Sequence, residues 1–116
     1  MSRELVFSPE AVEQLAALYA YLAGASTPAT AARYTEAIIS YCESLQDFPY
    51  LGTMRDDVRA GLRITHYRKR AVIAFDVDAA RVSIIGVFYG GQNHEAILRG
   101  ASGDPSARDE PERDVE

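Results

Sequence analysis

The sequence predicts an α+β fold, in which an N-terminal strand and an antiparallel two-helix hairpin precede a three-stranded antiparallel meander, all strands forming one sheet. Two observations predict it. Apolar residues recur at three- and four-residue steps over residues 11–22 and again over residues 34–48, a spacing typical of the buried face of a helix. Three β-rich runs then follow, and the connections between them are short enough for hairpins.

The first predicted helix follows a short apolar segment, residues 3–7, which we expect to be a strand. Ser8 is a favourable N-cap and Pro9 suits the first helical position. The helix should end near Gly24. Its predicted apolar stripe consists of Ala11, Val12, Leu15, Leu18, Tyr19 and Leu22.

A second helix is predicted to start at Ser26-Thr27-Pro28 and to end before Pro49, which cannot continue it. Because only a few residues separate the two helices, they must lie nearly antiparallel. The predicted stripe of the second helix consists of Tyr34, Ile38, Tyr41, Leu45 and Phe48. Residues 49–61 are expected to form a loop.

The meander is predicted from the runs 62–67, 70–77 and 81–89, joined by Arg68-Lys69 and by residues 78–80. The last run is apolar on both faces, so it should be central, with the segment 3–7 in the same sheet. A short helical turn is expected over residues 92–98.

Composition indicates one globular domain, because 116 residues with 47% hydrophobic and 25% charged residues is an ordinary balance. Cys42 has no second cysteine to pair with, and His66 and His94 add no zinc-ligand spacing. We therefore expect no metal, no cofactor and a cytoplasmic location. No apolar run approaches the roughly 20 residues of a membrane span.

Charge is distributed unevenly along the chain, whose net charge is -5. Residues 1–50 carry -4, residues 51–100 carry +3 and residues 101–116 carry -4. The last segment has one apolar residue larger than alanine, Val115, so burial cannot offset the entropy of ordering it. We expect a single domain over residues 1–100 and a disordered acidic tail over residues 101–116.

The sequence has no phosphate loop, nucleophile elbow or metal motif. The candidate functional residues that remain are mostly cationic. Strand alternation places Arg63 and Tyr67 on the face opposite Leu62 and Ile64. If the helices cover the face with Leu62 and Ile64, Arg63 and Tyr67 stand on an open face. The bases form a cluster that suits phosphate or carboxylate partners or, alternatively, a solvated surface: Arg55, Arg59, Arg63, Arg68, Lys69, Arg70 and Arg81.

Three further side chains have both a structural and a functional interpretation. His66 is expected to be partly buried and hydrogen-bonded rather than catalytic. His94, after the last strand, is an exposed capping residue or a general acid or base. Tyr89 packs at the edge of the core or offers its ring or hydroxyl to a ligand. Cys42 and the helix tyrosines are expected to be packing residues.

Five segments, in this order, resemble the RelE/ParE superfamily of toxins over residues 3–98. The Pro-x-x-Gly junction at residues 49–52 and the long helices resemble its ParE branch more than its RelE branch. The segments are Phe7-Ser8-Pro9-Glu10-Ala11, Leu18-Tyr19-Ala20-Tyr21-Leu22, Leu45-Gln46-Asp47-Phe48-Pro49-Tyr50-Leu51-Gly52, Leu62-Arg63, and Ile84-Ile85-Gly86-Val87-Phe88-Tyr89-Gly90-Gly91.

This resemblance implies the toxin of a type II toxin-antitoxin system, held in a hetero-oligomer by a small cognate antitoxin that neutralises it. A ParE-like toxin is expected to inhibit DNA gyrase, with growth inhibition and plasmid stabilisation as consequences and no reaction of its own. The alternative is a RelE-like toxin that cleaves mRNA on the ribosome, with Arg63, Arg81 and Tyr89 matching its catalytic pattern. Many relatives have histidine at the position of Tyr89. A second alternative is an inactive antitoxin-binding module.

The partner surface expected from the charge distribution is the cationic segment that runs from Arg63 to Arg70, where acidic antitoxin side chains would dock. The residues predicted to bind a partner are Arg63, Tyr67, Arg68, Lys69, Arg70 and His94.

Overall fold

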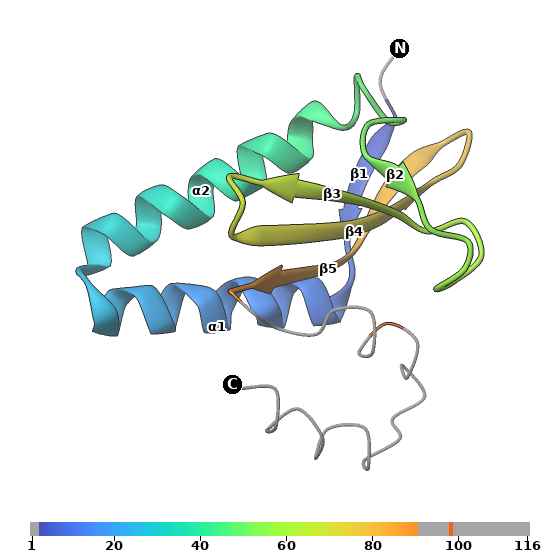
Figure 1. Ribbon diagram of the computed structural model, residues 1–116. Coiled ribbons are helices and arrows are strands. Elements are labelled where there is room, and N and C mark those ends of the chain that lie inside the picture. Colours follow the sequence, from blue (N-terminus) through green and yellow to red (C-terminus); the bar gives the residue numbers. More distant parts are fainter. Residues whose placement is uncertain (1–2, 91–97, 99–116) are drawn as a thin grey trace.

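The computed structural model describes residues 3–90 and Leu98 (Figure 1). Its sheet has the order β1-β5-β4-β3-β2; β1 runs parallel to β5 and the other neighbours are antiparallel. This confirms the predicted α+β class, with the N-terminal strand in the sheet. The elements are β1 (Glu4–Phe7), α1 (Pro9–Ala25), α2 (Pro28–Ser44), β2 (Thr53–Met54), β3 (Arg63–Tyr67), β4 (Ala71–Val77) and β5 (Arg81–Tyr89).

One strand was not predicted. Thr53 and Met54, inside the expected loop, pair with Ile64 and Arg63 and add β2 at the outer edge of the sheet. A strand of two exposed residues has no apolar alternation, so its sequence carries no period to detect. His94, residues 92–97 of the expected helical turn and the acidic tail lie outside the described residues.

Both helices start where their caps were predicted. The Ser8 Oγ accepts from the Ala11 backbone N–H at 3.0 Å, and the Thr27 Oγ1 accepts from the Thr30 N–H at 3.0 Å. Each cap is followed by a proline, which lacks the N–H that would otherwise be unpaired there. Among the described residues, no helix is long and apolar enough to cross a bilayer.

The predicted stripes were partly wrong. α2 ends at Ser44, so Phe48 leaves the helix and is 64% exposed. On α1, Val12 and Tyr19 are 54% and 39% exposed, whereas Ala11 and Leu18 are buried. The stripe of α1 is therefore narrower than the sequence indicated. Cys42 is buried as expected, and burial raises the pKa of its thiol to about 12.

The sheet has apolar side chains on both faces, and the helical hairpin covers the face opposite to the one expected. Leu62 and Ile64 pack away from the helices, whereas Thr65 and Tyr67 lie beneath α2. The Tyr41 hydroxyl and the Thr65 Oγ1 share a hydrogen bond of 2.8 Å. The cluster on the far face consists of Val58, Leu62, Ile64, Ala74, Phe88 and Leu98.

A β-bulge in β5 determines how α1 meets the sheet. Ala74 pairs with Gly86 but Phe75 pairs with Ile84, so Ile85 is an extra residue in β5. As a result, Ile84 and Val87, three positions apart, both join the helix-side core. Beyond Phe7, where β1 ends, α1 replaces β1 as the neighbour of β5 (Figure 1).

Two side chains, one from α1 and one from its N-cap residue, form hydrogen bonds with backbone groups of the bulged segment of β5. The Ser8 Oγ donates to the Ile85 carbonyl at 2.9 Å, and the Val87 N–H donates to the Gln14 Oε1 at 2.7 Å. Since buried backbone groups without partners are costly, these bonds both anchor α1 and close this edge of β5. Ser8 thereby links the start of α1 to β5 in addition to capping the helix.

Substituting Gln14→Leu should destabilise the fold, because the Val87 N–H would lose its acceptor while staying partly buried. We expect the free energy of unfolding to fall by about 1–2 kcal/mol, measured by urea denaturation. Glu13→Leu, at an exposed position on the same helix, is the matched control and should change it little. Equal stability of the Gln14 variant and the control would contradict this role of Gln14.

Candidate functional site

Five tyrosine rings form a continuous row at the end of the sheet where β5 finishes and the β3–β4 hairpin turns. They come from both helices and from β3 and β5. Neighbouring ring centroids lie 6.3, 5.7, 5.8 and 5.4 Å apart along the row Tyr21, Tyr89, Tyr34, Tyr67 and Tyr41. Tilted and edge-on contacts at these separations are favourable between aromatic rings. We call these five residues the tyrosine row.

Tyr34 is the electrostatically unusual member of the tyrosine row. Its hydroxyl is buried and has no hydrogen-bond partner among the described residues. Burial raises the pKa of Tyr34, and Tyr89 and Tyr67 raise it further, against a smaller opposing effect of nearby arginines. Tyr34 is therefore held as a neutral phenol and is not poised to act as a base.

A strongly cationic turn, which we call the basic turn, lies beside the tyrosine row and consists of Arg68, Lys69 and Arg70. All three residues are exposed, and no carboxylate in the described part of the chain forms an ion pair with them. The Arg68 guanidinium lies 5.3 Å from the centroid of the Tyr67 ring. The Arg70 carbonyl accepts from the Gly90 N–H at 2.9 Å, which ties the turn to the end of β5.

The backbone of the basic turn is strained. Arg68 and Lys69 have φ values of 56° and 73°, in the left-handed region. Two successive residues with positive φ strongly favour Asn-Gly, and side chains with a Cβ cost about 1–2 kcal/mol each there. This sequence therefore keeps two cations at positions where other residues would give a more stable turn.

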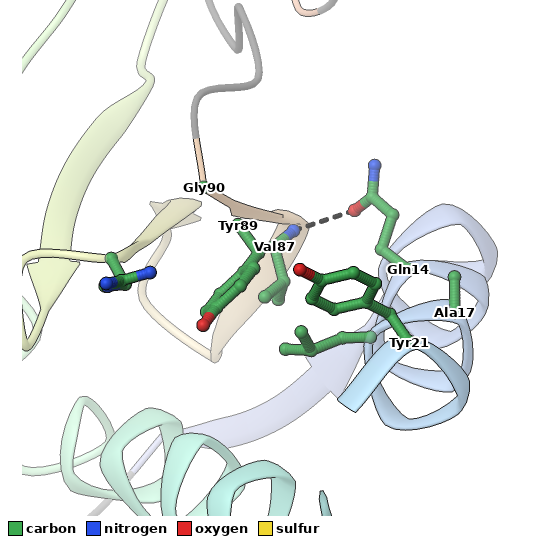
Figure 2. Close-up of a pocket in the computed structure, with 8 residues that line it drawn as sticks. Gln14, Ala17, Tyr21, Val87, Tyr89 and Gly90 are labelled. Atoms are coloured by element: carbon green, nitrogen blue, oxygen red, sulfur yellow. Dashed lines mark hydrogen bonds between the residues drawn. The ribbon is translucent and has the colours of Figure 1, made fainter. Parts of the chain in front are cut away.

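A pocket of about 360 Å³ opens between α1 and the end of β5, next to Arg70 of the basic turn. Figure 2 shows the Tyr21 ring from α1 beside the Tyr89 ring from β5, and the hydrogen bond that the Val87 N–H donates to Gln14. Its walls are mainly apolar, with the Arg70 guanidinium, two phenols and one carboxamide as polar groups. The lining residues are Gln14, Ala17, Leu18, Tyr21, Arg70, Val87, Tyr89 and Gly90.

Some predicted site residues come together here and others do not. Tyr67, Arg68, Lys69, Arg70 and Tyr89 gather at the tyrosine row and the basic turn. Arg63 lies at the opposite end of β3, where its Nη2 donates to the Tyr50 carbonyl at 2.8 Å and its Nε to the Leu51 carbonyl at 3.4 Å. Arg63 therefore holds a loop of its own chain.

The three residues that match the RelE-like catalytic pattern are not brought to one site. Arg81 starts β5 and lies 3.9 Å from a Glu4 carboxylate oxygen, whereas Tyr89 ends β5. Tyr89 lies eight positions after Arg81 along the extended strand, a separation of roughly 26 Å. His66 is exposed, so its expected partial burial was wrong, and His94 is outside the described residues.

Sequence reasoning missed Gln14 and Tyr21 as site residues and treated Tyr34 and Tyr41 as packing residues only. One signal was available for Gln14: it is a polar residue within a helical stripe in which Ala11 and Leu18 are buried and Leu15 is partly buried. A polar side chain at such a position indicates a buried backbone group that needs a partner. Nothing in the one-dimensional spacing indicated that tyrosines from four elements would meet.

The chemistry of this end of the sheet suits binding of a protein segment. Exposed cations lie beside aromatic rings and an apolar pocket, and together they suit a partner that carries carboxylates and apolar side chains. In the described part of the chain, no group of three or more His, Cys, Asp or Glu side chains is placed to hold a metal ion.

A solved structure has the same fold as this chain. A chain from the chromosomal ParDE TA system of P. aeruginosa superposes with a TM-score of 0.68 at 19% sequence identity, covering 77% of this chain and 97% of that chain. No curated protein sequence matches this chain.

A family model describes the ParE toxin of the type II toxin-antitoxin system parDE, and it matches residues 5–94. That match spans the helical hairpin, the sheet except its first residue Glu4, the tyrosine row and the basic turn. The chain belongs to the ParE toxin family of type II toxin-antitoxin systems.

Proposed function

We propose that this protein is a toxin that inhibits DNA gyrase and that a small cognate antitoxin neutralises it by binding. The observation that carries the proposal is the ParE family match over residues 5–94. The separation of Arg81 from Tyr89 on β5 supports gyrase inhibition over the RelE-like alternative, because general acid-base chemistry needs its groups within hydrogen-bond reach of one substrate. A net charge of -5 also fits poorly with a nuclease that must approach ribosomal RNA.

The antitoxin is proposed to dock at the basic turn and along the tyrosine row. Its carboxylates would pair with Arg68, Lys69 and Arg70, and its apolar side chains would enter the pocket beside Tyr21 and Tyr89. The positive φ values of Arg68 and Lys69 support this assignment. Backbone strain of this kind is found mainly at functional sites, so strain at two exposed cations indicates that these cations have a function. Arg63 lies at the other end of β3, at the Tyr50 loop, and is not part of this proposed antitoxin site.

The target is tested by comparing two activities of the purified protein: inhibition of DNA supercoiling by gyrase and cleavage of mRNA on translating ribosomes. We expect supercoiling to be inhibited and the message to stay intact. Cleaved message with normal supercoiling would support the RelE-like alternative instead. Absence of both effects, together with normal growth of cells that express the protein alone, would support an inactive antitoxin-binding module.

The role of the basic turn is tested with the double variant Arg68→Asn and Lys69→Gly. This variant should be more stable by about 1 kcal/mol, because Asn-Gly relieves the positive-φ strain. Its affinity for the antitoxin should nevertheless fall by about tenfold, which corresponds to the loss of about 1.4 kcal/mol. Thermal unfolding and titration calorimetry measure the two effects.

A matched control removes two exposed cations elsewhere, with Arg33→Asn and Arg59→Asn. It has the same net charge as the turn variant and should keep the affinity of the unmodified protein within about twofold, since charges beyond the interface act mainly on the association rate. If the turn variant and the control bind the antitoxin equally well, the basic turn is not its docking site.

A further inference from the structure

A second exposed surface lies at the far end of β3 from the basic turn. It consists of the large apolar side chains of Phe48, Tyr50, Leu51 and Met54, which are 64%, 63%, 40% and 49% exposed. We call these four residues the 48–54 patch. They fall within seven consecutive residues that include the Pro-x-x-Gly junction, and neither the proposed antitoxin site nor the core uses them. Tyr50 and Met54 both contact the Arg63 guanidinium, the ring centroid at 5.4 Å and the Met54 Sδ at 3.8 Å. Exposed apolar side chains gathered in this way mark interaction surfaces.

The loop that carries the 48–54 patch is held in one conformation. Gly52 has a φ of 81°, and a Cβ at this position would collide with the Ile64 carbonyl oxygen. Only glycine can therefore bring the loop this close to β3. After Gly52, Thr53 and Met54 pair with β3 as the edge strand β2.

Two arginines fix the central tyrosine of the patch. The guanidinium carbons of Arg3 and Arg63 lie 5.6 and 5.4 Å from the centroid of the Tyr50 ring. The Arg3 Nη2 donates to the Tyr50 hydroxyl at 3.2 Å, and the Arg63 Nη2 donates to the Tyr50 carbonyl at 2.8 Å. The side chain and backbone of Tyr50 are thus both restrained before any partner binds, which lowers the entropic cost of binding.

The composition of this surface is typical of the energetic centre of a protein interface. Tyrosine and arginine are, with tryptophan, the residues enriched there, and methionine and phenylalanine are also enriched in interfaces. The guanidinium groups of Arg3 and Arg63 donate to carbonyl and phenol oxygen atoms, and neither forms an ion pair with a described carboxylate. Both cations at the border of the patch are therefore available to a partner's carboxylates.

We infer that the 48–54 patch is a docking surface for a protein partner that offers an apolar cavity bordered by carboxylates, and that this partner is the toxin's target, at a site separate from the antitoxin. The identification of the target as gyrase rests on the proposed function. The cavity receives Phe48 and Met54, and the bordering carboxylates face Arg3 and Arg63.

Two other occupants fit the chemistry less well. A second copy of this chain, placed by two-fold symmetry on the patch, would bring Arg3 and Arg63 of both copies together, and like charges at an interface oppose association. The chain's own C-terminal residues 99–116 contain one apolar residue larger than alanine, Val115, and one such side chain is too few to cover four exposed ones.

The test uses the full-length double variant Phe48→Ser and Met54→Ser. Both side chains are about half exposed or more, so the fold should tolerate the change. The matched control is Val12→Ser and Tyr19→Ser, which removes two exposed large side chains from α1. For each protein we would measure the concentration that half-inhibits supercoiling by purified gyrase, the affinity for gyrase, the affinity for the antitoxin and the thermal unfolding curve.

The patch variant should need at least about tenfold more protein for half-inhibition and should lose gyrase affinity to the same extent. Its antitoxin affinity and its unfolding curve should match those of the control. Undiminished inhibition by the patch variant overturns the inference and leaves the proposed function intact. Reduced antitoxin affinity of this variant overturns it as well, because the patch would then belong to the antitoxin site. If the unmodified protein does not inhibit gyrase, the proposed function fails first and this assignment fails with it.

Discussion

The fold depends on how the edge of β5 is closed beyond the end of β1. β1 covers this edge only as far as Ile84, and the bulge at Ile85 then changes which backbone groups point outward. Ser8 and Gln14 bond to the Ile85 carbonyl and the Val87 N–H, so α1 takes the place of a sixth strand. The same two bonds fix the direction in which the helical hairpin crosses the sheet, and every helix residue at the site depends on that direction.

The arrangement of side chains at the end of the sheet follows from these two hydrogen bonds. Once α1 is held against β5, Tyr21 faces Tyr89, and α2 brings Tyr34 and Tyr41 over Tyr67. The pocket lies between α1 and the end of β5, and the bonded residues Gln14 and Val87 are part of its lining. The basic turn adds charge to this end, whereas the 48–54 patch gives the other end of β3 an apolar surface bordered by two arginines. A small domain thereby presents two surfaces of different chemistry.

Much of this fold could be predicted from the sequence because its signals are local. The caps at Ser8 and Thr27 and the three meander strands each depend on neighbouring residues. The sheet face that the helices cover could not be predicted, because the side chains on either face of β3 are able to pack against a helix. Thr65, a polar residue, is buried on the helix side because it shares a hydrogen bond with Tyr41. The roles of Arg63 and Gln14 were missed for a related reason: their partners are 13 and 73 residues away. Part of the site was predictable from charge, namely the basic turn, whereas the tyrosine row depends on tertiary contacts.

The two ends of β3 are proposed to serve different partners. Hydrogen-deuterium exchange of the protein, alone and with its antitoxin, tests this proposal directly because it reports on each segment separately. The antitoxin should slow exchange of the backbone amides of residues 67–71 and 87–90 and leave those of residues 50–54 unchanged. Slower exchange at residues 50–54, or no change around the basic turn, would contradict the proposal.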